Sequence, residues 1–110
     1  MESRVSQAVS TFESGYTCAQ SVFATYADLF GLDRETALKL ASPMGGGVGR
    51  MREICGVVSA MALLAGLKEG NTDPENEDGK ERIYLLTRKM AEKFKEKNNS
   101  IICRELLGIE

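Results

Sequence analysis

The chain has 110 residues, and its 14 Lys and Arg against 16 Asp and Glu give a net charge of −2. We therefore expect no nucleic-acid partner, because binding to phosphates needs an excess of basic residues. A hydrophobic fraction of 43% and a charged fraction of 27% are typical of a soluble globular domain with a single core. The lack of histidine in the sequence excludes Ser-His-Asp and Cys-His catalytic sites, Cys₂His₂ zinc sites and c-type haem attachment.

Helical periodicity dominates the first half of the chain, and no stretch alternates like a β-strand. Two predicted helices end at Gly15 and Gly31, because glycine enters left-handed conformations at little cost, and a third ends before Pro43. We expect one apolar face of the first helix to pack into the core. That face carries Val5, Ala8, Val9 and Phe12. The three predicted helices span residues 3–14, 17–30 and 33–42.

The second half predicts two more helices and a short terminal turn. A helix over residues 52–67 carries small side chains in one row, so we place it at the centre of the bundle. A polar loop follows, and Asp78 with Glu81 resembles a capping box for a helix that runs to about residue 97. A last helical turn covers residues 101–107. The sequence therefore predicts an all-α, single-domain bundle of about five helices with a short terminal helical turn, over residues 1–110.

A glycine-rich segment, residues 44–49, joins the third and fourth helices. Its N–H groups could form a nest for an anion before a helix N-terminus. The sequence lacks the Walker and dinucleotide-binding patterns, so we do not expect this segment to bind a nucleotide. We favour a structural role in which the glycines let the chain turn tightly. Contact of their amides with a sulfur is a further hypothesis. The candidate cofactor-binding residues are Gly45, Gly46, Gly47 and Gly49.

The three cysteines, Cys18, Cys55 and Cys103, form no CxxC pair, but each lies at or near the start of a predicted helix. The positive end of a helix dipole stabilises a thiolate, and a lowered thiol pKa is shared by nucleophilic, redox and metal-binding cysteines. Free cysteine is also often a small buried residue, so a purely structural role stays open. Cationic side chains near the second and third cysteines are Arg50, Arg52 and Arg104.

The expected cellular location rests on two sequence features, a signal peptide and a membrane-spanning segment. We see no signal peptide, and the longest uncharged run, residues 54–67, is too short to span a bilayer. We therefore expect a cytoplasmic protein without membrane insertion, in a reducing environment that favours reactive or metal-binding thiols over permanent disulfides.

Five segments, in order along nearly the whole chain, resemble the motifs of one family. They are GYTCAQSV at residues 15–22, GGGVGR at 45–50, EICG at 53–56, LAGLKEG at 64–70 and SIICRELLG at 100–108. On these motifs the chain resembles the C_GCAxxG_C_C family of redox-active proteins, which is related to a domain of split-Soret cytochromes. The resemblance implies an all-helical fold, a redox or metal-centre function, and four cysteines, of which Cys18, Cys55 and Cys103 would be three.

Two departures from the family pattern bear on the site. The central motif reads CGVVSA at residues 55–60, so its alanine and last glycine are replaced, and the sequence to Glu110 holds no fourth cysteine. Three thiolates do not complete a Cys₄ site, so a metal or Fe–S cluster would need a carboxylate, a water or a second subunit, as in a homodimer. A dithiol–disulfide pair with a spare thiol needs no fourth cysteine.

Two functions follow from these observations. In the first, Cys18, Cys55 and Cys103 converge at one end of the bundle and either exchange between dithiol and disulfide or hold a metal or Fe–S centre for electron transfer to a redox partner protein. Cys55 is then the expected most reactive thiol. In the second, the chain is a non-catalytic helical binding or assembly module with buried cysteines.

Overall fold

The structure, a computed structural model, describes residues 3–108, and these form helices and turns without a β-strand. In chain order the helices are α1 (Val5–Glu13), α2 (Cys18–Ala27), the 3₁₀ helix η1 (Asp28–Phe30), α3 (Arg34–Ala41), the 3₁₀ helix η2 (Ser42–Met44), α4 (Gly56–Glu69), α5 (Glu77–Asn98) and α6 (Cys103–Leu106). The predicted all-α bundle is confirmed. None of the helices in residues 3–108 has the length and apolar content needed to cross a membrane.

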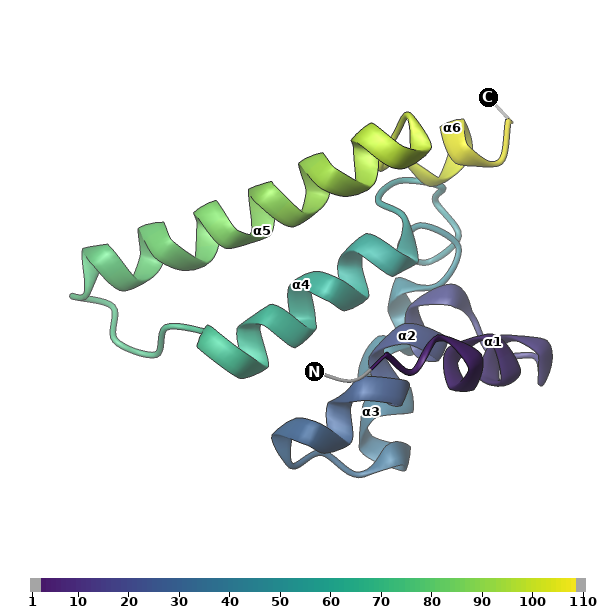
Figure 1. The fold of residues 1–110 in the computed structure, drawn as a ribbon, viewed down its shortest axis with the longest axis horizontal. Helices are drawn as coiled ribbons and strands as arrows, with labels where there is room; N and C mark the ends of the chain where they lie inside the picture. Colours follow the sequence, from purple (N-terminus) through teal and green to yellow (C-terminus); the bar gives the residue numbers. More distant parts are fainter. Residues whose placement is uncertain (1–2, 109–110) are drawn as a thin grey trace.

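Helix α2 is the hub of the arrangement, since α1, α3 and α4 all pack against it. Helices α4 and α5 lie side by side as a hairpin, and their connecting loop points away from the other helices (Figure 1). The short α6 follows α5 and lies near the chain that leads into α4. The opposite end of the hairpin from its loop therefore brings together the starts of α2, α4 and α6.

The core around α2 is built largely of alanine. The side chain of Phe23 is 2% exposed and is the one large side chain that is fully buried among the described residues. The other members of the core cluster are small: Ala19, Ala24, Ala27, Ala37, Ala41 and Ala60. Because small side chains fill little space between helices, the backbones of α2, α3 and α4 come close together.

The closest approach lies where α4 begins. A Cβ atom built on Gly56 would lie 2.9 Å from the backbone nitrogen of Ala19 and 3.1 Å from its Cβ, closer than such atoms normally come. Ala19 itself is 0% exposed. Glycine at residue 56 therefore lets the first turn of α4 rest directly on the first turn of α2.

The predicted inner face of the first helix is wrong. Val5, Val9 and Phe12 are 63%, 49% and 52% exposed, whereas Thr11 is buried and its hydroxyl donates to the carbonyl oxygen of Gln7. Within the described residues, helix α2 is the one helix against which α1 packs extensively. The apolar residues of α1 therefore lie beside an open groove and not in the core.

Two helix starts also differ from the prediction. Helix α4 begins at Gly56, not near Arg52, because Arg52 has a φ of 62° and Ile54 forms an antiparallel bridge with Ile102. Helix α5 is capped by Asn76, whose side chain accepts a hydrogen bond of 2.9 Å from the N–H of Gly79, so Asp78 is inside the helix.

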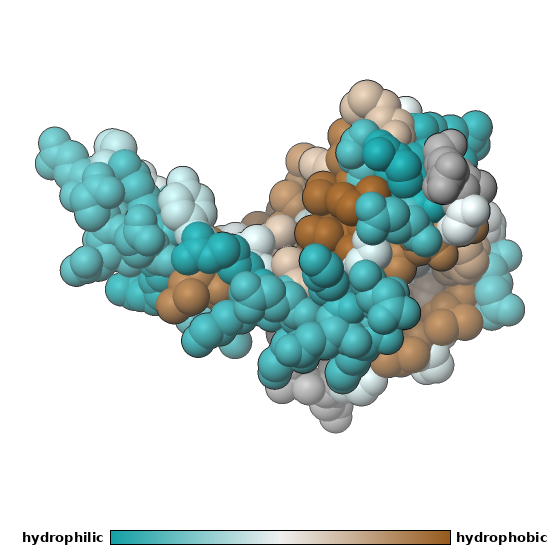
Figure 2. Space-filling view, turned by 90° about the horizontal axis from the view of Figure 1, so that it is seen from above, coloured by the Kyte–Doolittle hydropathy of each residue, from teal (hydrophilic) through white to brown (hydrophobic). Residues whose placement is uncertain are grey.

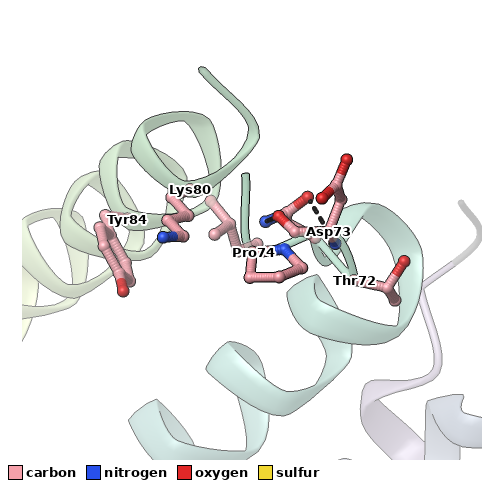
Figure 3. Close-up of a pocket in the computed structure, with 7 residues that line it drawn as sticks. Thr72, Asp73, Pro74, Lys80 and Tyr84 are labelled. Carbon is pink, nitrogen blue, oxygen red and sulfur yellow. Dashed lines mark hydrogen bonds between the residues drawn. The ribbon is translucent and has the colours of Figure 1, made fainter. Parts of the chain in front are cut away.

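The polar loop between α4 and α5 is ordered by its own side chains. The Asn71 carboxamide oxygen accepts from the N–H of Asp73, and the Asn71 amide donates back to the Asp73 carbonyl oxygen. Figure 3 shows this segment beside Lys80 and Tyr84 of α5, with which it lines a shallow pocket. Asp73 and Lys80 are the charged residues that line this pocket, and none of the three cysteines lines it.

Replacing Gly56 by alanine tests the contact between α2 and α4. We expect Gly56→Ala to lower the free energy of unfolding by about 1–3 kcal/mol, because the new methyl group meets the Ala19 backbone. Gly66 is the matched control, since it lies in the same helix with nothing within 4 Å of its Cβ position. Gly66→Ala should raise stability by about 0.5–1 kcal/mol, because alanine favours a helix interior. Urea unfolding measures both, and equal effects of the two substitutions would contradict the contact.

Candidate functional site

Cys18 is the first residue of α2, and its position is fixed by a capping box. Thr17 accepts a 3.2 Å hydrogen bond on its hydroxyl from the N–H of Gln20, while the Gln20 side chain accepts a 3.1 Å bond from the N–H of Thr17. Gln20 also donates through its amide nitrogen to the carbonyl oxygen of Leu38 on α3, at 3.0 Å. The exposed Cys18 therefore lies in a helical turn that is held by hydrogen bonds within the turn and by one hydrogen bond to α3.

Cys55 caps the start of α4 and is held by a short ladder to the segment before α6. Its N–H donates to the carbonyl oxygen of Ile101 at 2.7 Å, and the N–H of Cys103 donates to the carbonyl oxygen of Glu53 at 2.5 Å. These two bonds flank the bridge between Ile54 and Ile102. At this single bridge Cys55 follows Ile54 and Cys103 follows Ile102, so the two cysteines lie diagonally across from each other.

Cys103 begins α6, and its surroundings are polar. The N–H of Ile102 donates to the hydroxyl of the buried Ser100, which in turn donates to the carboxylate of Glu105 at 2.6 Å. The guanidinium of Arg52 donates to the sulfur of Cys103 at 3.9 Å. The cationic side chain beside Cys103 is thus that of Arg52, which lies nearer to Cys55 in the sequence.

Arg104 does not serve as a cation for the neighbouring thiol, because its guanidinium pairs with the carboxylate of Glu53. This ion pair joins the same two segments as the ladder. The backbone N–H of Arg104 also donates to the carbonyl oxygen of Arg52. Arg104 therefore helps to hold α6 against the chain before α4.

The glycine-rich loop packs against the segments that carry all three cysteines. A Cβ on Gly47, whose φ is +73°, would come 2.7 Å from the Cβ of Cys103 and 2.6 Å from the nitrogen of Glu53. A Cβ on Gly45 would meet the Thr17 side chain at 2.6 Å. These close approaches agree with the structural interpretation of the loop, in which glycine allows the chain to press against its neighbours.

The amides of this loop are partly engaged inside it. The N–H of Gly45 donates to the carbonyl oxygen of Ser42, and the N–H of Gly49 donates to that of Pro43. Gly45 and Gly47 are also buried. A cofactor-binding role for Gly45, Gly46, Gly47 and Gly49 stays a prediction, and these two internal bonds leave fewer donors for an anion.

The three cysteines are brought to the same end of the bundle. Although Cys18 is exposed as a residue, nearby protein atoms partly desolvate its sulfur, and this desolvation is the main reason that the pKa of Cys18 is raised above its usual value. Repulsion from the charges of Cys55 and Cys103 raises this pKa further. A hydrogen bond from its own backbone N–H acts in the opposite direction. The expectation of a lowered thiol pKa is therefore wrong for Cys18, since desolvation and neighbouring thiolates outweigh the start of the helix.

The thiols are free, and none is sealed in the core. Cys18 is exposed, and Cys55 and Cys103 are half-buried. Buried cysteines that only fill space, as the binding-module interpretation supposes, would lie among the alanines of the core instead. The exposure of Cys18 leaves this end of the bundle open to another thiol or disulfide.

The thiol and carboxylate side chains that could bind a metal are spread apart in the described part of the chain. Within residues 3–108, no three cysteine, aspartate or glutamate side chains gather closely enough to hold a metal. Tetrahedral metal sites need three or four such ligands at about 2.0–2.3 Å from one centre. A metal site on Cys18, Cys55 and Cys103 stays a prediction.

A family model described as "Putative redox-active protein (C_GCAxxG_C_C)" matches residues 16–110. The chain belongs to the C_GCAxxG_C_C family. A search of curated proteins and a search of solved structures found no match. The matched range includes the residues that position two of the cysteines, since Thr17, Ala19 and Gln20 lie around Cys18 and Gly56 follows Cys55.

Sequence reasoning missed the ladder between residues 53–55 and 101–103. The available signal was the β-branched pattern of Ile54, Ile101 and Ile102 beside two of the cysteines, since isoleucine favours extended backbone. It also missed the contact of Arg52 with Cys103, because that contact joins residues 51 positions apart.

Removing the neighbouring thiols should shift the titration of Cys18. In the double variant Cys55→Ser/Cys103→Ser we expect a lower pKa of Cys18 than in the unmodified protein, because two repelling charges are gone while the burial remains. The pH dependence of Cys18 alkylation by iodoacetamide, followed by peptide mass spectrometry, measures this pKa. Identical profiles in the two proteins would show that the thiols do not interact.

The raised pKa of Cys18 makes the stability of the fold depend on pH. Because the folded state favours the protonated thiol, Cys18 contributes its full stabilisation of the folded state at pH values below the usual thiol pKa of 9.0. This stabilisation is lost as pH rises through the raised pKa of Cys18 in the folded state.

Proposed function

We propose that this member of the C_GCAxxG_C_C family is a thiol–disulfide redox protein in which Cys55 is the shared partner of Cys18 and Cys103. The family is described as redox-active, which supports the general class. The specific proposal is supported by two backbone contacts, one from Cys55 toward the segment before α6 and one from the adjacent Gly56 toward α2.

Cys55 is linked to its two neighbours by different contacts. Toward α2, the adjacent Gly56 rests on Ala19, the residue after Cys18. Toward α6, the N–H of Cys55 and the N–H of Cys103 form the two bonds of the ladder. A disulfide needs Cα atoms within about 7 Å, so small adjustments at either contact would let Cys55 pair with one cysteine or the other.

The reaction is a two-electron exchange. The Cys55 thiolate attacks one sulfur of an oxidised partner's disulfide, forms a mixed disulfide and releases the first partner thiolate. The thiolate of Cys18 or Cys103 then attacks the Cys55 sulfur and releases the second partner thiolate. Two thiols of this chain are oxidised to a disulfide, two protons are lost, and the partner disulfide is reduced to a dithiol.

The partner in this proposal is a redox protein with an accessible disulfide, because the exposed Cys18 leaves the site open at the surface. A cytoplasmic location fits the three free thiols of the resting state. Electron transfer through a metal or Fe–S centre would need ligands beyond the three cysteines, and it stays a prediction of the family resemblance.

Serine variants test the shared role of Cys55. On oxidation with excess oxidised glutathione, Cys18→Ser and Cys103→Ser should each form one intramolecular disulfide, whereas Cys55→Ser should form none. Peptide mapping under non-reducing conditions identifies each bond, and circular dichroism confirms that the variants are folded. An intramolecular bond between Cys18 and Cys103 in Cys55→Ser, formed as fast as the bonds of the unmodified protein, would refute the proposal.

A further inference from the structure

Positive and negative side chains are sorted to opposite ends of the hairpin formed by α4 and α5. Residues 68–81, around its projecting end, include six acidic and two basic residues and carry a net charge of −4. Residues 88–105, which lead past Cys103, include six basic and three acidic residues and carry a net charge of +3. Figure 2 shows hydrophilic side chains over the projecting end. Because the 22 residues of α5 span about 33 Å and the Debye length at physiological salt is about 8 Å, a partner meets the two ends as separate charged surfaces.

A row of three lysines, which we call the lysine row, makes up much of the positive end. Lys89, Lys93 and Lys97 are exposed and follow one another at a spacing of four residues, so they lie along one face of α5. The four ion pairs among residues 3–108 are formed by other side chains. Like charges at this spacing destabilise a helix by about 0.2–0.5 kcal/mol per pair. Lys97 lies in the last turn, where the helix dipole favours a cation, but Lys89 and Lys93 lie too far from the end to share this benefit.

The positive charge continues from the lysine row to the thiols. The last turn of α5 leads through Ser100 into the ladder that holds Cys55 and Cys103. At the ladder, the guanidinium of Arg52 lies 3.9 Å from the sulfur of Cys103. The exposed Arg50 follows the glycine-rich loop that packs on this site. Cationic side chains therefore extend from one face of α5 to a sulfur at which a disulfide partner would react.

We infer that the lysine row docks a partner protein whose disulfide is bordered by acidic residues, an inference that rests on the proposed thiol–disulfide exchange. Opposite charges on two surfaces raise their rate of association, and like charges suppress the wrong partners. The acidic projecting end repels the same partner surface and so directs it toward the end that carries the thiols. A nucleic acid would meet an overall charge of −2, which favours a protein with a local acidic patch.

Disulfide peptides of different charge test this inference on the full chain. Each peptide contains one disulfide, flanked on both sides by glutamates, by glutamines or by lysines. At an ionic strength of about 0.02 M, the reduced protein should reduce the acidic peptide at least about tenfold faster than the basic peptide. At about 0.5 M the two rates should agree to within about twofold, because salt screens charges at the surface. Mass spectrometry of acid-quenched samples measures each rate.

Two triple variants locate the selection on the surface. Replacing the whole lysine row, in Lys89→Gln/Lys93→Gln/Lys97→Gln, should lower the preference for the acidic peptide at least about threefold. The matched control also removes three positive charges, but on α3 and around the projecting end of the hairpin, and it should change the preference by less than about twofold. Its substitutions are Lys39→Gln, Lys68→Gln and Lys80→Gln. Circular dichroism establishes that both variants are folded.

The outcomes separate this inference from the proposed function. A reduced protein that leaves all of the peptides oxidised would refute the thiol–disulfide exchange, and the inference with it. Equal rates for the three peptides at low salt, or an equal loss of preference in the two triple variants, would overturn the inference and leave the exchange intact. Retention of a short RNA by the lysine row, without any preference among the peptides, would assign these charges to a different partner and would equally overturn the inference.

Discussion

The contact between Ala19 and Gly56 is the constraint on which the rest of the molecule depends. It joins the first turns of α2 and α4 through the backbone of Gly56 and the backbone and methyl group of Ala19, with no larger side chain between them. Cys18 precedes one of these residues and Cys55 precedes the other, so the same contact that closes the core sets the two thiols beside each other. A larger residue at either position would separate the helices and the cysteines together.

The third thiol is placed by a backbone in an unusual conformation. From Gly46 to Arg50 every residue has a positive φ, and Val48 and Arg50 are not glycine. A left-handed conformation costs about 1–2 kcal/mol at a residue with a Cβ, so the surrounding fold must hold this loop in place. The N–H groups of Arg52 and Glu53 bond back to Gly46 and Gly47, and Glu53 in turn binds Cys103. Strain of this kind is concentrated at functional sites, which agrees with a site at this end of the bundle.

Much of the fold could be predicted because its signals are local. Gly31 ends α2 and η1 with a φ of 88°, and α3 ends at Ala41, next to the predicted boundary before Pro43. The start of α4 could not be found in this way. It depends on pairing between Ile54 and Ile102, and helical periodicity carries no information about residues so far apart in the chain. The raised pKa of Cys18 was missed for a similar reason, since burial and neighbouring thiolates arise only after folding.

The proposed function requires that the three thiols form one site, and a short bifunctional thiol reagent tests this most directly. In the native protein we predict rapid bridging of Cys55 to Cys18 or to Cys103 within one chain, and loss of this rapid bridging after unfolding in urea. Mass spectrometry of the digested product identifies the bridged pair. Native protein in which each cysteine reacts singly, without bridges, would contradict the shared site.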